Sequence, residues 1–219
     1  MTVTAIILCH YQERVGNIDR IVEDLKKSTV PPDKIIVFND NSTVNYFSEG
    51  VTSINADSNF PVITRYALAL TIDTDYFFFI DDDMTVTKDT LSNFILYAKK
   101  YPGHTLGYEG TKLVEGERPY FNGKYVKATN QPVNSDILTR LYFVPKHILS
   151  EVFIVREDNK DLPKENIDDI ILSVSNRGNN LVIPSYEAEV IDLQDGGVGQ
   201  CKTEQHYINR DIASSILFK

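Results

Sequence analysis

The fold of this chain is decided by the stretch Tyr76-Phe77-Phe78-Phe79-Ile80-Asp81-Asp82-Asp83, in which five bulky apolar residues run directly into three acids. A short apolar run of this kind is typical of a strand that is covered on both faces of a sheet. Alternate residues of an extended segment point to the same side, so Asp81 and Asp83 can approach one hard cation, which prefers carboxylate oxygen. Although a solvated turn that caps the next helix is the competing interpretation, we predict a buried strand that ends in a metal site.

Strands and helices alternate on both sides of this stretch. Apolar runs predict strands over residues 3–9, 35–38 and 51–54, and helical spacing predicts helices over residues 18–25, 62–72 and 91–101. Such alternation favours a mainly parallel sheet with helices on both faces. The expected fold class is therefore α/β, a three-layer α/β/α, Rossmann-like arrangement around a mainly parallel central sheet.

The second half of the chain has a different character. Asn122-Gly123 suits a type I′ turn, so residues 120–125 are expected to form a β-hairpin. Further expectations are a strand over residues 137–144, a helix over 168–177 closed by Gly178, a flexible loop over 195–199 and a last helix over 204–217. No repeat or linker divides the chain, so we expect a single domain over residues 1–219.

Composition limits the classes of protein to which this chain can belong. Its 219 residues are 42 % hydrophobic, which is enough for one globular domain with a sizeable core. The formal net charge is −9 and no block of Lys or Arg is present, which argues against nucleic acid or an anionic membrane surface as a partner. An acidic protein that handles phosphates needs a cation or a few well-placed basic side chains, because clustered carboxylates repel a diphosphate.

Cysteine usage and hydropathy indicate a reducing compartment. Cys9 and Cys201 are too few and too widely separated for a disulfide framework or a zinc site, and Cys9 lies in an apolar run typical of a core. The N-terminus lacks a basic segment, and no apolar stretch reaches the roughly 18 residues of a membrane span. We expect a cytoplasmic location and no membrane span in this chain, with an anchor possible only outside it if the chain is an excised domain.

Three polar clusters follow predicted strands, at residues 10–14, 39–42 and 81–83. In a parallel sheet the carboxyl ends of the strands meet at one edge, and ligands bind in the crevice there. We therefore expect these clusters to share one site, although they are distant in the sequence.

The order of these segments resembles the GT-A fold of nucleotide-sugar glycosyltransferases. The quoted segments are Ile6-Ile7-Leu8-Cys9-His10-Tyr11, Ile36-Val37-Phe38-Asn39-Asp40-Asn41-Ser42 and Phe78-Phe79-Ile80-Asp81-Asp82-Asp83, which resemble family 2, while Asp168-Asp169-Ile170 resembles exostosin-type enzymes. The resemblance is strong over residues 1–90 and looser afterwards. The chain's length also resembles that of a capsid-glycosylating domain from a large algal virus, which would act in the host cytoplasm.

The resemblance implies a function and a division of labour. It implies transfer of a sugar from a UDP-sugar donor to a hydroxyl of a glycan or glycoprotein acceptor, with Mn²⁺ or Mg²⁺ as the metal. Residues 1–103 would form the nucleotide-binding half and residues 104–219 the acceptor-binding half. An exostosin-like retaining enzyme and an inverting enzyme both fit, so the stereochemistry stays open.

Matching positions carry the family's nucleotide contacts onto this sequence. By resemblance, Tyr11 would line the uracil pocket and Asp40 would accept a hydrogen bond from the ring N–H of the base. Arg65 would touch the nucleotide. The sequence departs from the family at Gln12-Glu13, where Asn-Arg or Asn-Glu is commoner, which leaves base contacts there open.

The metal ligands are assigned in the same way. Asp83 would ligate the metal directly, Asp81 would meet the ribose or a metal-bound water, and Asp82 fills the variable middle position. His206 follows the glycine-rich loop and would be a third ligand, or else a surface histidine on a helix. The remaining histidines, His10, His104 and His147, lack acidic neighbours in the sequence and are expected to be structural.

Two further assignments lie in the second half. Asp169 matches the family's catalytic acid and Asp168 stands beside it where Glu is usual; the competing interpretation is two acids that favour a helix N-terminus. A helix N-terminus keeps Asp169 ionised, as a general base must be. Arg140, in a segment that resembles the family's sugar-contacting region, could touch donor sugar or phosphate, or be only a surface base.

Three other functions compete with sugar transfer. Asp81-Asp82-Asp83-Met84-Thr85 also fits a haloacid-dehalogenase-like phosphatase, with Asp81 as nucleophile and Asp83 as general acid. That signature normally ends the first strand, whereas two strand–helix units precede it here. A sugar-1-phosphate nucleotidyltransferase would need a glycine-rich loop where residues 10–14 stand, and a metal- or carbohydrate-binding module would not be stabilised by nucleotides.

Overall fold

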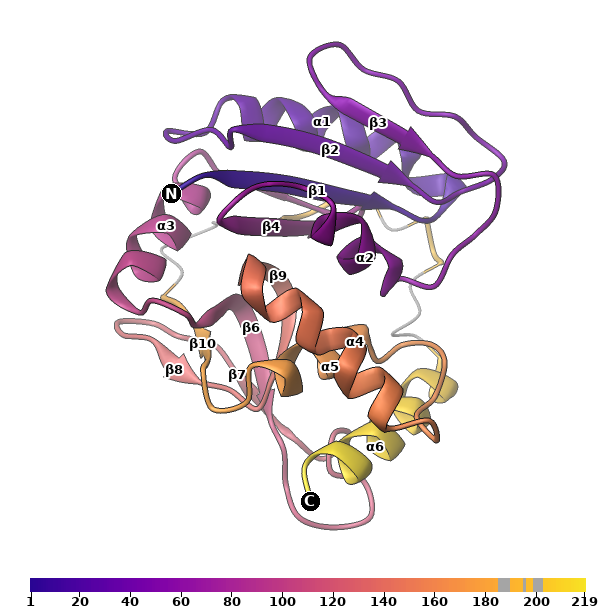
Figure 1. The fold of residues 1–219 in the computed structure, drawn as a ribbon, viewed down its shortest axis with the longest axis vertical. Helices are drawn as coiled ribbons and strands as arrows, with labels where there is room; N and C mark the ends of the chain where they lie inside the picture. Colours follow the sequence, from indigo (N-terminus) through magenta and orange to yellow (C-terminus); the bar gives the residue numbers. More distant parts are fainter. Residues whose placement is uncertain (185–189, 195, 199–202) are drawn as a thin grey trace.

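A computed structural model describes residues 1–184, 190–194, 196–198 and 203–219 (Figure 1). Its central sheet is built from β1 (Val3–Cys9), β2 (Lys34–Asn39), β3 (Thr52–Asn55), β4 (Tyr76–Asp81), β6 (Thr105–Lys112), β7 (Lys124–Val126), β8 (Val133–Asn134), β9 (Ile137–Pro145) and β10 (Asn180–Val182). A second, two-stranded sheet pairs β5 (Met84–Val86) with β11 (Val190–Asp192). The helices are α1 (Val15–Lys26), α2 (Thr64–Leu70), α3 (Thr90–Lys100), α4 (Leu149–Asp158), α5 (Asp168–Ser175) and α6 (Glu204–Leu217), with short 3₁₀ turns η1 (Gln12–Arg14) and η2 (Lys146–Ile148).

The central sheet is mainly parallel, as expected. Its order is β3-β2-β1-β4-β9-β6-β10-β8, with β7 paired to β6. The strands β3, β2, β1, β4, β6 and β10 run in one direction, and only β7, β8 and β9 oppose them within the described sheet. Since β9 joins β4 to β6, strands from both halves of the chain form one continuous sheet.

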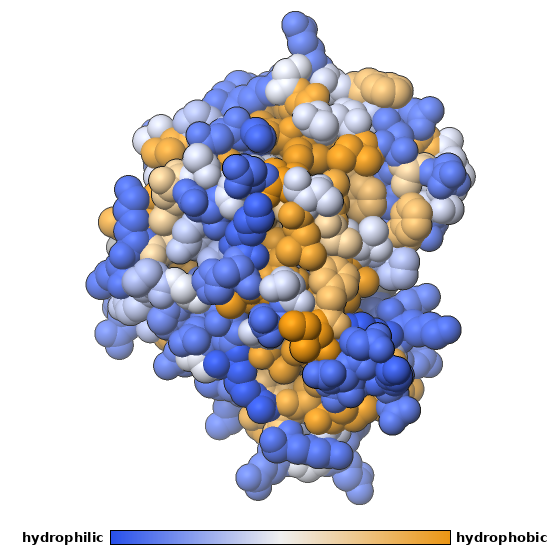
Figure 2. All heavy atoms as spheres, viewed as in Figure 1, coloured by the Kyte–Doolittle hydropathy of each residue, from blue (hydrophilic) through white to orange (hydrophobic). Residues whose placement is uncertain are grey.

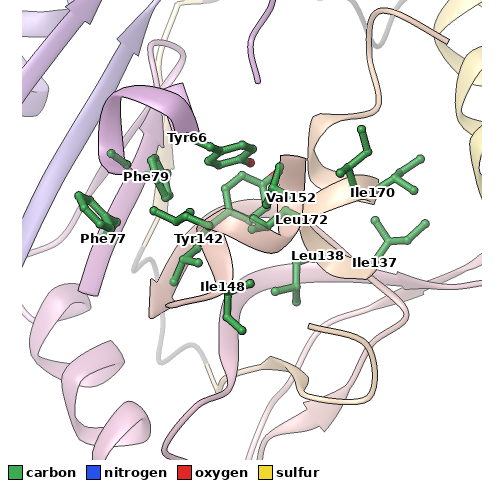
Figure 3. Close-up of a cluster of buried hydrophobic side chains, with 14 of the residues drawn as sticks. Tyr66, Phe77, Phe79, Ile137, Leu138, Tyr142, Ile148, Val152, Ile170 and Leu172 are labelled. Atoms are coloured by element: carbon green, nitrogen blue, oxygen red, sulfur yellow. The ribbon is translucent and has the colours of Figure 1, made fainter. Parts of the chain in front are cut away.

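The apolar stretch that precedes the three acids is buried because β4 has a core on each face. Phe77 and Phe79 point into one hydrophobic cluster, which α2, α4, α5 and α6 cover (Figure 3). Phe78 and Ile80 point into the other, which α1 and α3 cover. These two clusters confirm the three-layer α/β/α arrangement. Burial on both faces explains why the strand shows no alternation of apolar and polar residues.

Apolar side chains also reach the surface. Figure 2 is viewed from the same side as Figure 1. It shows a band of apolar side chains on the face where α2 and α4 lie. Leu70 of α2 and Ile154 of α4 are among the exposed apolar residues. No helix in the described ranges combines the length and the apolar character that crossing a bilayer requires.

The expected hairpin over residues 120–125 is wrong. Tyr120 and Gly123 close a turn, in which the Gly123 N–H donates to the Tyr120 carbonyl, and β7 pairs with β6 instead. Gly123 does not have the positive φ that a type I′ turn demands. Glycine is required at this position because its backbone lies close to β6, where a Cβ would be only 2.6 Å from Cγ2 of Thr111.

Most other expected elements are present, with ends shifted by a few residues. The helix expected over 62–72 spans Thr64–Leu70, and α5 ends at Ser175, three residues before Gly178 with its φ of 84°. In the expected loop 195–199, positions 195 and 199 lie outside the described residues, as does Cys201, while Gly196 and Gly197 have positive φ.

Asp82 ties the loop after β1 to the end of β4. Its carboxylate accepts hydrogen bonds from the backbone N–H groups of His10 (2.9 Å) and Tyr11 (3.3 Å) and from Nη1 of Arg14 (2.8 Å). The residue is only 2 % exposed. Burial raises the pKa of the Asp82 carboxyl, and the hydrogen bonds from Arg14 and His10 oppose that rise. Asp82 therefore positions this loop.

Replacing Asp82 with Ala is expected to destabilise the protein by about 3–5 kcal/mol, because it leaves the Arg14 guanidinium buried without its closest carboxylate. Urea unfolding followed by circular dichroism measures the change. Asp73, which is fully exposed before β4, provides the control: Asp73→Ala should stay within about 0.5 kcal/mol of wild type. A loss below about 1 kcal/mol for Asp82→Ala would show that the tie is not structural.

Candidate active site

The predicted site residues converge at the carboxyl ends of β1 and β4. A pocket of about 210 Å³ is lined by eight of the ten, namely Tyr11, Arg65, Asp81, Asp82, Asp83, Asp168, Asp169 and His206. An adjoining pocket of about 760 Å³ is lined by Arg140 and shares Asp81, Asp83, Asp169 and His206 with the first. Asp40 lines neither of these pockets.

Arg65 joins two of the carboxylates. Its Nη1 lies 2.6 Å from Asp81 and its Nη2 lies 2.7 Å from Asp168, so α2 holds the end of β4 and the start of α5 together. The guanidinium is buried beside aromatic rings, and burial opposes but does not prevent a raised Arg65 pKa. Burial likewise raises the pKa of Asp168, against the opposing effect of Arg65. Both terminal nitrogens of Arg65 are thus occupied by protein.

Asp83 shares a guanidinium with Asp82. Arg14 Nη1 lies 2.8 Å from Asp82 and 3.2 Å from Asp83, and the Asp83 side chain is 32 % exposed toward the pockets. Burial, together with the nearby Asp81 charge, raises the pKa of Asp83 to about 6. Asp83 is therefore ionised at neutral pH but poorly neutralised, as is favourable for a carboxylate that binds a cation.

Asp169 is clamped by Arg210 of α6. The two Nη atoms of Arg210 lie 2.8 Å and 2.5 Å from the two carboxylate oxygens, and Oδ1 also accepts the N–H of Ile170. Both side chains are almost fully buried. Such a bidentate pair fixes the orientation of the carboxylate. It also leaves about one of the roughly four acceptor positions of the carboxylate free.

His206 begins the last helix and faces both pockets. Thr203 caps α6 by accepting the N–H of His206, and the side chain of His206 lines the first pocket together with Asp168 and Arg210. Burial and the Arg210 charge lower the His206 pKa to about 4, so the ring is neutral at physiological pH. Its buried Nδ1 has no hydrogen-bond partner among the described residues.

These groups fit a divalent metal in their chemistry. Asp81 and Asp83 supply hard carboxylate oxygens and are each about one third exposed, while the orphaned Nδ1 of His206 is a neutral nitrogen. Within the described part of the chain, however, no three His, Cys, Asp or Glu side chains are already grouped closely enough to hold an ion. The donor set is present but not preassembled.

Asp40 and His10 form a pair that the sequence reading missed. Nδ1 of His10 lies 3.0 Å from the fully buried Asp40 carboxylate, and this hydrogen bond raises the His10 pKa. The expectation that His10 lacks acidic company is therefore wrong: its partner is thirty residues away in sequence. His10 lines the first pocket, and the predicted contact of Asp40 with the base stays a prediction.

Arg140 lies on the far side of the second pocket. It forms an ion pair with Asp192 of β11 and stands opposite Glu109 in the pairing of β9 with β6. A bulge interrupts this pairing at Thr139, and the next residue but one, Leu141, has a φ of 52° although it is buried in the core. Bulges of this kind re-aim side chains beside functional sites.

Three basic residues that matter here could not be assigned from the sequence alone. Arg14 and His10 stand in the polar cluster after β1, but nothing in the sequence shows their partners. For Arg210 the sequence does offer a clue, because this residue follows His206 by four positions and therefore lies on the same face of the last helix. A predicted ligand at His206 thus implies that Arg210 also faces the site.

Comparison with known proteins places this geometry in a family. The profile of glycosyl transferase family 2 matches residues 5–162, well over half of the chain. No match was found among curated proteins.

Solved structures share the fold. S. aureus TarS 1-349 in complex with UDP-GlcNAc superimposes with a TM-score of 0.63 at 16 % identity, over 98 % of this chain and 66 % of that one. GalNAc-T7 with UDP, GalNAc and Mn²⁺ gives a TM-score of 0.71 at 13 % identity, over 98 % of this chain and 48 % of that one. This chain therefore spans about two thirds of the TarS segment and about half of GalNAc-T7. At these identities the likeness establishes the GT-A fold, and the profile match shows that the chain belongs to glycosyl transferase family 2.

Proposed function

We propose that this protein transfers a sugar from a UDP-sugar to a hydroxyl of a glycan or glycoprotein with the help of Mn²⁺ or Mg²⁺. The observation that carries the proposal is that Asp81, Asp83, Asp169 and His206 together line the pockets at the carboxyl end of β4. Family membership and two similar folds with bound UDP or a UDP-sugar support the donor class. In this proposal residues 1–103 bind the nucleotide and residues 104–219 supply the base and the acceptor site.

Asp81 and Asp83 would hold the metal, with His206 as a nitrogen ligand from α6. The bound ion would act as a Lewis acid that neutralises the leaving diphosphate. Arg65 and Arg14 pair with these carboxylates now and hold them at the pocket. Tyr11, in the loop that Asp82 fixes, lies in the same pocket and is proposed to contact the base.

Asp169 is the proposed general base. Its clamp by Arg210 fixes the orientation of the carboxylate and leaves about one acceptor position on Oδ2, from which it can accept the proton of an acceptor hydroxyl. Asp168, which is bound to Arg65, is proposed to hold Arg65 in place. A phosphatase of the haloacid-dehalogenase kind is disfavoured, because β4 is not the first strand and the profile of glycosyl transferase family 2 covers it.

A melting-temperature screen tests the function. UDP-sugars with Mn²⁺ should raise the melting temperature by about 5–10 °C at 100 times their dissociation constant, since such binding contributes about 2.7 kcal/mol and each kcal/mol shifts a protein of this size by about 2–4 °C. ADP- and GDP-sugars serve as matched ligands. Equal shifts for all bases, or none for uridine, would refute a UDP-sugar donor.

Replacing Asp83 with Ala should reduce Mn²⁺-dependent hydrolysis of the UDP-sugar by at least about 100-fold, because it removes a direct metal ligand. Release of UDP from the donor in the absence of acceptor is the measurement. Asp73→Ala, at the other end of β4, should hydrolyse the donor as wild type does. An unaffected rate in Asp83→Ala would contradict the ligand assignment.

Replacing Asp169 with Asn should lower kcat for transfer by about 10²–10⁴-fold, because the amide keeps the shape of the carboxylate but accepts no proton. The dissociation constant of UDP should stay unchanged, and isothermal titration calorimetry checks it. Asp168→Asn is the comparison and should affect kcat less. A larger loss in Asp168→Asn than in Asp169→Asn would transfer the role of base to Asp168.

A further inference from the structure

The larger pocket continues from the proposed metal site toward β6, β9 and β11. It shares Asp81, Asp83 and Asp169 with the first pocket and extends to Glu109, Arg140 and Asp192. If Asp81 and Asp83 hold the diphosphate through a metal, as the proposed function has it, the sugar attached to that diphosphate must extend into an adjoining space. The larger pocket adjoins the metal site and includes the proposed base, so it is the space available to the transferred sugar.

The charge of this lining is negative. The described residues that line it include five acids, Asp81, Asp83, Glu109, Asp169 and Asp192, against two arginines, Arg140 and Arg210. The excess is therefore three negative charges, five minus two. Both terminal nitrogens of Arg210 are paired with Asp169, which leaves Arg140 as the one other cation that the described lining offers.

Arg140 is already neutralised. It forms an ion pair with Asp192, and Glu109 stands opposite it on the neighbouring strand. Both carboxylates contribute to the raised pKa of Arg140 against the effect of burial. One guanidinium that faces two carboxylates has no net positive charge to offer an anionic ligand.

The remaining lining groups suit hydroxyls. Thr139, at the bulge in β9, Tyr120 and Gln194 present neutral donors or acceptors. A neutral ring with several hydroxyls could pair with such groups, whereas a carboxylate would meet Glu109 and Asp192.

We propose that this pocket holds the transferred sugar and that Glu109 and Asp192 restrict it to uncharged sugars. UDP-hexoses are accepted, and UDP-hexuronates, which differ from them by a carboxylate in place of a hydroxymethyl group, are rejected. Asp192 has a second role, since it cancels the charge of Arg140. The inference rests on the proposed function, because it presupposes a bound nucleotide sugar.

Two matched pairs of donors test this specificity, UDP-glucose with UDP-glucuronate and UDP-galactose with UDP-galacturonate. Calorimetry with Mn²⁺ gives the dissociation constant of each. In wild type at least one hexose should bind about ten-fold or more tightly than its uronate. In Asp192→Asn, which frees Arg140, that ratio should fall by about ten-fold, as expected for removal of one opposing charge. Glu109→Gln should shift it in the same direction.

Two controls distinguish a failure of the specificity proposal from a failure of the proposed function. Asp73→Asn makes the same change of charge on an exposed residue before β4 and should leave the ratio unchanged. UDP alone should bind all variants alike, which also shows that each variant folds. If UDP binds but wild type takes uronates as tightly as hexoses, or neither variant moves the ratio, the specificity proposal is overturned alone. If wild type binds no UDP, the proposed function falls and this inference falls with it.

Discussion

Three buried guanidinium groups hold together the acids on which this site depends. Arg14 pairs with Asp82 and Asp83, Arg65 with Asp81 and Asp168, and Arg210 with Asp169. Each arginine comes from a different segment, namely the loop after β1, α2 and α6, so the pairs join parts of the chain that are far apart in sequence. The planar guanidinium has five N–H donors in a fixed arrangement, so it can bridge two carboxylates with a defined geometry. Without these bridges the carboxylates would repel one another out of a shared pocket.

The same pairs leave a graded set of carboxylates. Asp82 and Asp169 are buried and saturated, or nearly so, with donors, and they have fixed positions. Asp81 and Asp83 are each held by one arginine contact and remain about one third exposed. This remaining negative charge lies at the pockets of a protein whose net charge is −9. A diphosphate can approach it only with a cation in between, which is the physical basis for the proposed metal dependence.

Several features that depend on local sequence patterns were predicted correctly. The apolar run of β4 predicts a doubly buried strand, and the cores on its two faces confirm this. The rule that parallel strands end at one edge brought Tyr11 and Asp81 together correctly, and the bounds of α6 agree with the prediction. The predicted hairpin over residues 120–125 is wrong because Asn122-Gly123 was interpreted as a type I′ turn. Glycine is required at position 123 by its close contact with Thr111 of β6.

Long-range pairing could not be read in the same way. Asp168 lies 103 residues from Arg65 in the sequence, and no local pattern in either segment predicts that the two side chains pair. The sequence likewise did not reveal that Asp40 pairs with His10. Anomalous diffraction from crystals grown with UDP and Mn²⁺ would show whether a cation at Asp81 and Asp83 binds the diphosphate. We expect a manganese peak that is coordinated by a carboxylate oxygen of Asp83 and by the phosphates of UDP. A map in which UDP is bound but no manganese lies beside Asp81 or Asp83 would contradict it.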